Sequence, residues 1–176
     1  MPRIIKTEAI VFKKITNLLH KDSLITLFTQ EHGKLKVFAK GIKKVTSRRL
    51  PHNQTGNLIK AIISRKDSFF YLQETELISH FSELKKDKAK INILYFYFFI
   101  LDRLLPENQK EPLIYNLTKR FLIELSQSAT FEEKKIAFYL NKVLTNLGYS
   151  DRELVFEEAV NLIEELINEK LPAFVI

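Results

Sequence analysis

Residues 34–40 read KLKVFAK, and side chains of two kinds alternate along them. One set is small or aliphatic and suits an interior: Leu35, Val37 and Ala39. The other set is mostly cationic: Lys34, Lys36, Phe38 and Lys40. Side chains of a β-strand point to opposite faces in turn, so this period of two predicts a half-buried strand.

Four further runs on either side are rich in β-branched and aromatic residues and predict strands at 4–13, 23–29, 57–65 and 69–75. Turn-forming pairs separate them: His32-Gly33, Lys40-Gly41, Thr55-Gly56 and Lys66-Asp67. Five short strands within about 75 residues are typical of a small barrel or a sandwich, and strand counting alone does not choose between them. We therefore expect a β domain at residues 1–80.

The remaining residues, 81–176, change to a helical period and predict an all-α domain. We expect a helix from about 87 to 105, a helix opened by Pro112, and two more that begin at capping boxes. These boxes pair Thr130 with Glu133 and Ser150 with Glu153, and Gly148 stands where the first of these helices should end. Residues 93–101, ILYFYFFIL, could form a groove for a partner's apolar segment, but a buried central helix is the favoured interpretation.

Composition excludes several classes of site among the 176 residues. The absence of cysteine rules out disulfides, cysteine-ligated zinc and cysteine nucleophiles, and it fits a reducing cytosol. The four histidines have no ligand-like spacing, and no glycine-rich phosphate-binding motif occurs. The apolar run at 93–101 is about half a membrane span, and no signal peptide is recognisable. We expect a soluble, cytoplasmic protein that is not an enzyme and has no cofactor or metal.

Positive charge is concentrated in the first half of the chain. Residues 1–80 carry 15 Lys or Arg against 6 Asp or Glu, a net +9, whereas residues 81–176 carry 13 against 15, a net −2. Residues 34–49, KLKVFAKGIKKVTSRR, hold seven cations and no acid. Such a segment could be only a solvated loop, but in a half that is already basic it favours binding of a polyanion.

Aromatic residues among these cations suggest a nucleic acid as the polyanion, because single-strand binders combine a basic groove with stacking platforms. The predicted DNA-binding residues are Lys34, Lys36, Phe38, Lys40, Lys43, Lys44, Arg48 and Arg49. In the strand at 69–75, Phe70 should face the core while Phe69 and Tyr71 face outward. Outward rings there are stacking candidates, although packing against the helical half would explain them equally well.

Four stretches together resemble the RecO family of DNA repair and recombination-mediator proteins: TEAIVFKK (7–14), DSLITLFTQEHGKLKVFAKGIKK (22–44), SRR (47–49) and LQETELI (72–78). The resemblance implies an α+β multidomain protein, with an N-terminal OB-fold β-barrel followed by a helical C-terminal domain. It also implies non-enzymatic binding of single- and double-stranded DNA, annealing of complementary strands, and loading of RecA with RecR onto DNA coated by single-strand DNA-binding protein. The cations of residues 34–49 would line the DNA path.

The chain departs from the family in two respects, and two other functions stay open. Many family members are longer, and some carry a cysteine-ligated zinc that this chain cannot form. An RNA-binding OB-fold module would prefer RNA over DNA in competition. A protein-interaction adaptor would act through residues 81–176, without measurable DNA affinity in residues 1–80.

Overall fold

The computed structural model describes residues 3–16, 23–39 and 52–173, and the chain divides into two compact units. The first unit comprises Met1–His80 together with Pro106–Pro112, and the second comprises Phe81–Leu105 together with Leu113–Ile176. The loop 106–112 therefore leaves the helices on either side of it and packs with the β unit.

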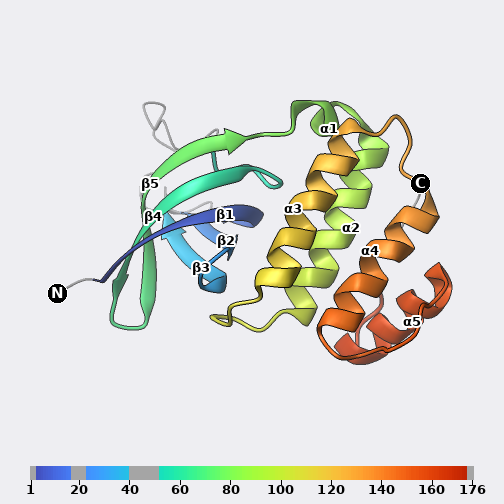
Figure 1. Ribbon diagram of the computed structural model, residues 1–176. Coiled ribbons are helices and arrows are strands. Elements are labelled where there is room, and N and C mark those ends of the chain that lie inside the picture. The colour runs from blue at the N-terminus through green and yellow to red at the C-terminus, as the bar shows by residue number, and fades with distance from the viewer. Residues whose placement is uncertain (1–2, 17–22, 40–51, 174–176) are drawn as a thin grey trace. The chain divides into compact units, whose positions relative to one another are not determined.

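In the described part of the first unit there are five strands: β1 (Arg3–Thr16), β2 (Ser23–Thr29), β3 (Gly33–Ala39), β4 (Leu58–Lys66) and β5 (Phe69–Ser79). They close into a barrel in the order β1-β2-β3-β5-β4 (Figure 1). The pairing of β3 with β5 is parallel, and the other four pairings are antiparallel. Closure decides the question that strand counting left open, and the predicted barrel is confirmed.

The barrel interior follows the alternation seen in the sequence. Leu35, Val37 and Ala39 of β3 are buried in a cluster with aliphatic side chains from every other strand. Phe70 and Leu77 of β5 pack against this cluster. Each strand thus contributes its apolar face to one core, and burial of those faces is the main favourable contribution to the free energy of folding.

Within the described residues the second unit is built from five helices, the third of which begins at the last residue of the loop 106–112: α1 (Ser82–Lys86), α2 (Lys88–Leu104), α3 (Pro112–Gln127), α4 (Glu133–Asn146) and α5 (Phe156–Ile167). The predictions for α2 and for Pro112 as the first residue of α3 are confirmed. Asp87 caps α2, because its side-chain Oδ1 accepts hydrogen bonds from the backbone N–H groups of Ala89 at 2.8 Å and Lys90 at 3.3 Å. No helix within the described ranges is long and apolar enough to cross a membrane.

Both predicted capping boxes are wrong. Helix α4 begins only after Glu132, because Phe131, which lies between Thr130 and the helix, is buried against the rings of Phe121 and Tyr139. Ser150 caps a local turn instead, where its hydroxyl accepts a hydrogen bond from the N–H of Arg152 at 3.3 Å. The capping box at Thr130 fails because of the tertiary packing of Phe131, and the one at Ser150 fails because the hydroxyl bonds locally instead.

The aromatic run at 93–101 is a core helix, as the favoured interpretation held. Most of it is buried, and Tyr97 stacks on Phe121 of α3 with ring centroids 4.0 Å apart. Tyr139 of α4 meets the same two rings edge-on. Three helices therefore share one aromatic centre, and each ring pair adds about 0.5–1.5 kcal/mol beyond its buried area.

Gly33 lies directly against the backbone of the loop 106–112. Its φ is +66°, and a Cβ placed there would lie 1.7 Å from the carbonyl oxygen of Gln109. A side chain at this position would meet both backbone strain and a direct clash. Gly148, which follows α4, has a φ of +78° but no atom within 4 Å of such a Cβ, so a side chain there meets strain alone.

We predict that Gly33→Ala lowers the free energy of unfolding by about 2–5 kcal/mol, because left-handed strain and overpacking both contribute. Gly148→Ala is the matched control and should cost only about 1–2 kcal/mol, from strain alone. Urea denaturation of the full chain, followed by circular dichroism, measures both values. Equal losses in the two variants would contradict the close approach of the loop to Gly33.

Candidate nucleic-acid interface

The basic segment, defined as residues 34–49, is only partly described by the structure. Lys34, Lys36 and Phe38 lie in β3. The remaining predicted residues lie outside the described residues: Lys40, Lys43, Lys44, Arg48 and Arg49. The geometry of the site therefore rests on β3 and on what surrounds it.

Lys34 does not belong to an open cationic face, and its predicted exposure is wrong. The residue is only 5% exposed. Its carbonyl oxygen accepts a hydrogen bond from the N–H of Asn108 at 2.9 Å, and Glu107 pairs with it in an isolated parallel bridge. The loop 106–112 runs along the start of β3, and alternation within the strand could not reveal a covering segment some 70 residues away in sequence.

Lys36 stays at the surface but has an acidic partner. Its ammonium group forms an ion pair with the carboxylate of Glu107, and the two side chains are 52% and 43% exposed. An ion pair so open to water contributes at most about 1 kcal/mol and weakens with salt. A phosphate group can therefore compete with Glu107 for this lysine.

A second ion pair ties the same loop to the barrel. Lys110 lies 2.7 Å from Glu31, which is in the turn between β2 and β3. The hydrogen bond and the positive charge of Lys110 lower the pKa of the Glu31 carboxyl below its ordinary value. Together with the bond from Asn108, this pair fixes the loop beside β3, where Glu107 reaches Lys36.

Three rings gather on the outer surface of the barrel and form what we call the outer aromatic cluster: Phe38, Phe69 and Tyr71. Phe38 and Tyr71 are partners in the parallel β3–β5 pairing, and their ring centroids are 5.9 Å apart. Phe69 meets Phe38 edge-on, also at 5.9 Å. Phe38 is 37% exposed and Phe69 53%, whereas Phe70 packs on the core. The predicted alternation in β5 is confirmed.

Cationic side chains adjoin this cluster. Lys66 is exposed and stands opposite Phe69 in the β4–β5 ladder, so both side chains project from the same face. Arg65 belongs to the other face of the strand, where it lies over the inward ring of Phe70, 5.6 Å from its centroid. The cluster thus has Lys66 at its edge on β4, and Lys36 precedes Phe38 by two residues on the same face of β3.

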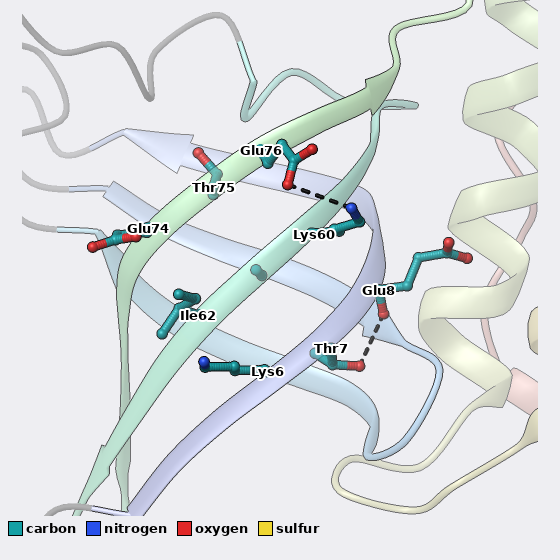
Figure 2. Close-up of a pocket in the computed structure, with 9 residues that line it drawn as sticks. Lys6, Thr7, Glu8, Lys60, Ile62, Glu74, Thr75 and Glu76 are labelled. Atoms are coloured by element: carbon teal, nitrogen blue, oxygen red, sulfur yellow. Dashed lines mark hydrogen bonds and ion pairs between the residues drawn. The ribbon is translucent and has the colours of Figure 1, made fainter.

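A different groove runs along the outer face of β1, β4 and β5 (Figure 2). Its volume is about 450 Å³, and it holds the carboxylates Glu8, Glu74 and Glu76 together with Lys6 and Lys60. Figure 2 shows Lys60 and Glu76 pointing toward each other, 3.5 Å apart. With three acids and two cations, this groove does not attract a polyanion.

Sequence reasoning missed this groove, because a register shift in the β4–β5 pairing between Ile62 and Ile63 changes which residues of β5 face outward. The outward side chains are aromatic at Phe69 and Tyr71 and acidic at Glu74 and Glu76. No group of three or more His, Asp or Glu side chains that could hold a metal ion occurs within residues 3–16, 23–39 and 52–173.

Comparison with known proteins agrees with this architecture. Residues 1–81 match the family model described as recombination protein O, N-terminal. Over 149 residues the chain is 34% identical to the DNA repair protein RecO of Caldanaerobacter subterraneus, and over 148 residues 31% identical to that of Thermoanaerobacter sp.. Each alignment covers 84% of this chain and 59% of the relative.

A third relative, the DNA repair protein RecO of Clostridium novyi, is 31% identical over 147 residues, which are 83% of this chain and 57% of that protein. The chain thus spans rather less than two thirds of the length of these curated relatives. The N-terminal barrel, residues 1–81, therefore belongs to the RecO N-terminal domain family.

Proposed function

We propose that the protein acts in DNA repair and homologous recombination, as a mediator that binds single- and double-stranded DNA. The observation that carries this proposal is the match of residues 1–81 to the RecO family, on a barrel half with a net charge of +9. Its RecO relatives are named DNA repair proteins. Since the substrate is chromosomal, we place this activity in the cytoplasm.

Capture of the DNA backbone is the first step of the proposed mechanism. The cations of the basic segment neutralise phosphates and release condensed counterions, which favours binding without regard to base sequence. Lys36 joins them when a phosphate displaces Glu107. If about five cations take part, the logarithm of the affinity for single strands should fall with the logarithm of salt with a slope near −3 to −4.

Strand annealing follows from the same charge neutralisation, because two DNA strands repel each other until their phosphates are screened. Cooperation with RecR, with single-strand DNA-binding protein and with RecA belongs to this proposal through family membership. The chain makes no covalent bond in this scheme: it holds strands and presents them, so no catalytic residue and no cofactor is required.

The direct test is charge reversal in the basic segment. A variant with Lys43, Lys44, Arg48 and Arg49 all changed to Glu should bind a single-stranded oligonucleotide at least about 10-fold more weakly, with a salt slope shallower by about 3. Fluorescence anisotropy across a salt series measures both quantities.

The control reverses the same number of charges in the helical unit, at Lys88, Lys134, Lys135 and Lys142, which are all exposed. Three of these lie in first helical turns, where an acid is tolerated. Affinity equal to wild type in the basic-segment variant, or an equal loss in both variants, would contradict the assignment. Stronger competition by RNA than by DNA of equal length would favour an RNA-binding module instead.

We also predict that complementary oligonucleotides anneal faster in the presence of the protein, without any nucleotide cofactor, and that the acceleration fades steeply with salt. The reason is that annealing depends on the same phosphate contacts as binding. Stopped-flow fluorescence of a labelled strand pair measures the rate. Acceleration that is insensitive to salt between 50 and 200 mM, roughly the range in which phosphate contacts weaken, would argue against backbone neutralisation.

Glu107 should weaken DNA binding, because its carboxylate forms an ion pair with Lys36 and so competes with phosphate for that lysine. We predict that Glu107→Gln raises the affinity for single strands by up to about 5-fold, the equivalent of a surface ion pair. Glu111→Gln removes the same charge from the same loop, where Glu111 accepts a hydrogen bond from Gln109, and serves as control.

The gain in affinity from Glu107→Gln should depend on Lys36, because it comes from freeing that lysine for a phosphate. In a Lys36→Gln background, Glu107→Gln should therefore change the affinity no more than Glu111→Gln does. An equal gain from both glutamine substitutions would mean that only net charge matters.

A further inference from the structure

The outer aromatic cluster of Phe38, Phe69 and Tyr71 leaves apolar ring surface exposed to water. The core lies on the other face of the same strands, where Val37, Phe70 and Leu72 are packed inward. Phe69, at 53% exposed, leaves more than half of its surface in water although its ring meets that of Phe38. An exposed patch of this kind, rimmed by polar residues, indicates a binding surface.

We propose that the outer aromatic cluster is a stacking platform for unpaired bases, and that it lets the protein distinguish single-stranded from duplex DNA. This inference rests on the proposed function, which supplies the DNA, and it adds the part of the site that recognises strand state. Backbone capture by cations is common to both DNA forms, whereas ring stacking requires bases whose faces are free.

Strand pairing holds the platform in place before any ligand binds. Phe38 and Tyr71 are fixed as cross-strand partners at the point where β3 and β5 close the barrel. Phe69 is two residues earlier on the same face of β5 and touches Phe38. Rings supported by a closed sheet lose little conformational entropy on binding, so most of the free energy of base stacking is retained.

The charges around the platform favour a nucleic acid over an apolar protein segment. Lys66 lies beside Phe69 across the ladder, and Lys36 is on the same face of β3 as Phe38, two residues away. Phosphates on both sides of a stacked base would thus meet ammonium groups. Farther along β5 the outward residues become Glu74 and Glu76, so the surface suited to a polyanion ends there.

The test compares three probes on the full-length chain: oligo-dT, an abasic single strand of equal length, and a duplex. We expect Phe69→Ala to weaken binding of oligo-dT by about 5-fold or more, and to change binding of the abasic strand and the duplex by less than about 2-fold. Phe69→Leu keeps an apolar side chain but removes the ring, and it should behave like Phe69→Ala.

Each other outcome has a definite meaning. An unchanged affinity for oligo-dT, an equal loss for all three probes, or full retention in Phe69→Leu overturns the platform; the last result would instead indicate apolar contact with the DNA that needs no ring. Because these outcomes presuppose DNA binding by the wild type, they differ from failure of the proposed function, in which none of the three probes binds.

A second measurement, tryptophan fluorescence at position 69, detects contact with bases without a comparison of affinities. The chain contains no tryptophan, so Phe69→Trp introduces a single tryptophan, at the platform, whose emission can be excited separately from that of the tyrosines. We expect oligo-dT to quench its emission and the abasic strand and the duplex to leave it nearly unchanged. Tyr149→Trp, at a 44% exposed position in the helical unit, is the control and should not respond. Equal responses of Phe69→Trp to all three probes would overturn the proposal.

Discussion

The parallel pairing of β3 with β5 is the constraint on which the rest of the barrel depends. Among the described residues it joins Val37 with Phe70 and Phe38 with Tyr71, and it converts an open sheet into a closed barrel. Val37 and Phe70 face inward and complete the core, while Phe38 and Tyr71 face outward. One short ladder therefore serves stability on one face and assembles the outer aromatic cluster on the other.

The loop 106–112 imposes a second constraint, and it comes from a distant part of the chain. The loop lies so close to position 33 that a side chain there would clash with it. The N–H of Asn108 donates a hydrogen bond to the carbonyl oxygen of Lys34, and the carboxylate of Glu107 forms an ion pair with Lys36. A segment between two helices of the second unit thus changes the electrostatics of the barrel. Because the ion pair between Lys36 and Glu107 is exposed, a phosphate needs little free energy to displace Glu107 from it. Lys34, in contrast, is buried and is not part of an open surface.

The sequence predicts the barrel well because its strands are amphipathic and its turns carry explicit signals. The alternation in residues 34–40 correctly identifies Leu35, Val37 and Ala39 as core. Local patterns fail where tertiary packing overrides them. Lys34 is buried under a loop about 70 residues away in sequence, and Thr130 does not cap α4 because the next residue, Phe131, is buried. The register shift in β5 is likewise invisible in the sequence, and with it the acidic groove.

The barrel surface offers two kinds of interaction to a nucleic acid: attraction of phosphates by cations and stacking of bases on aromatic rings. Cations attract any phosphate backbone, and their effect falls with salt; rings respond only to bases that are not already stacked, and stacking is largely indifferent to salt. Under the proposed function the protein binds both single strands and duplexes, and it gains from keeping these two contributions on separate side chains. The barrel allows this because alternation places Lys36 and Phe38 on one face of β3, with Lys66 and Phe69 together across the β4–β5 ladder.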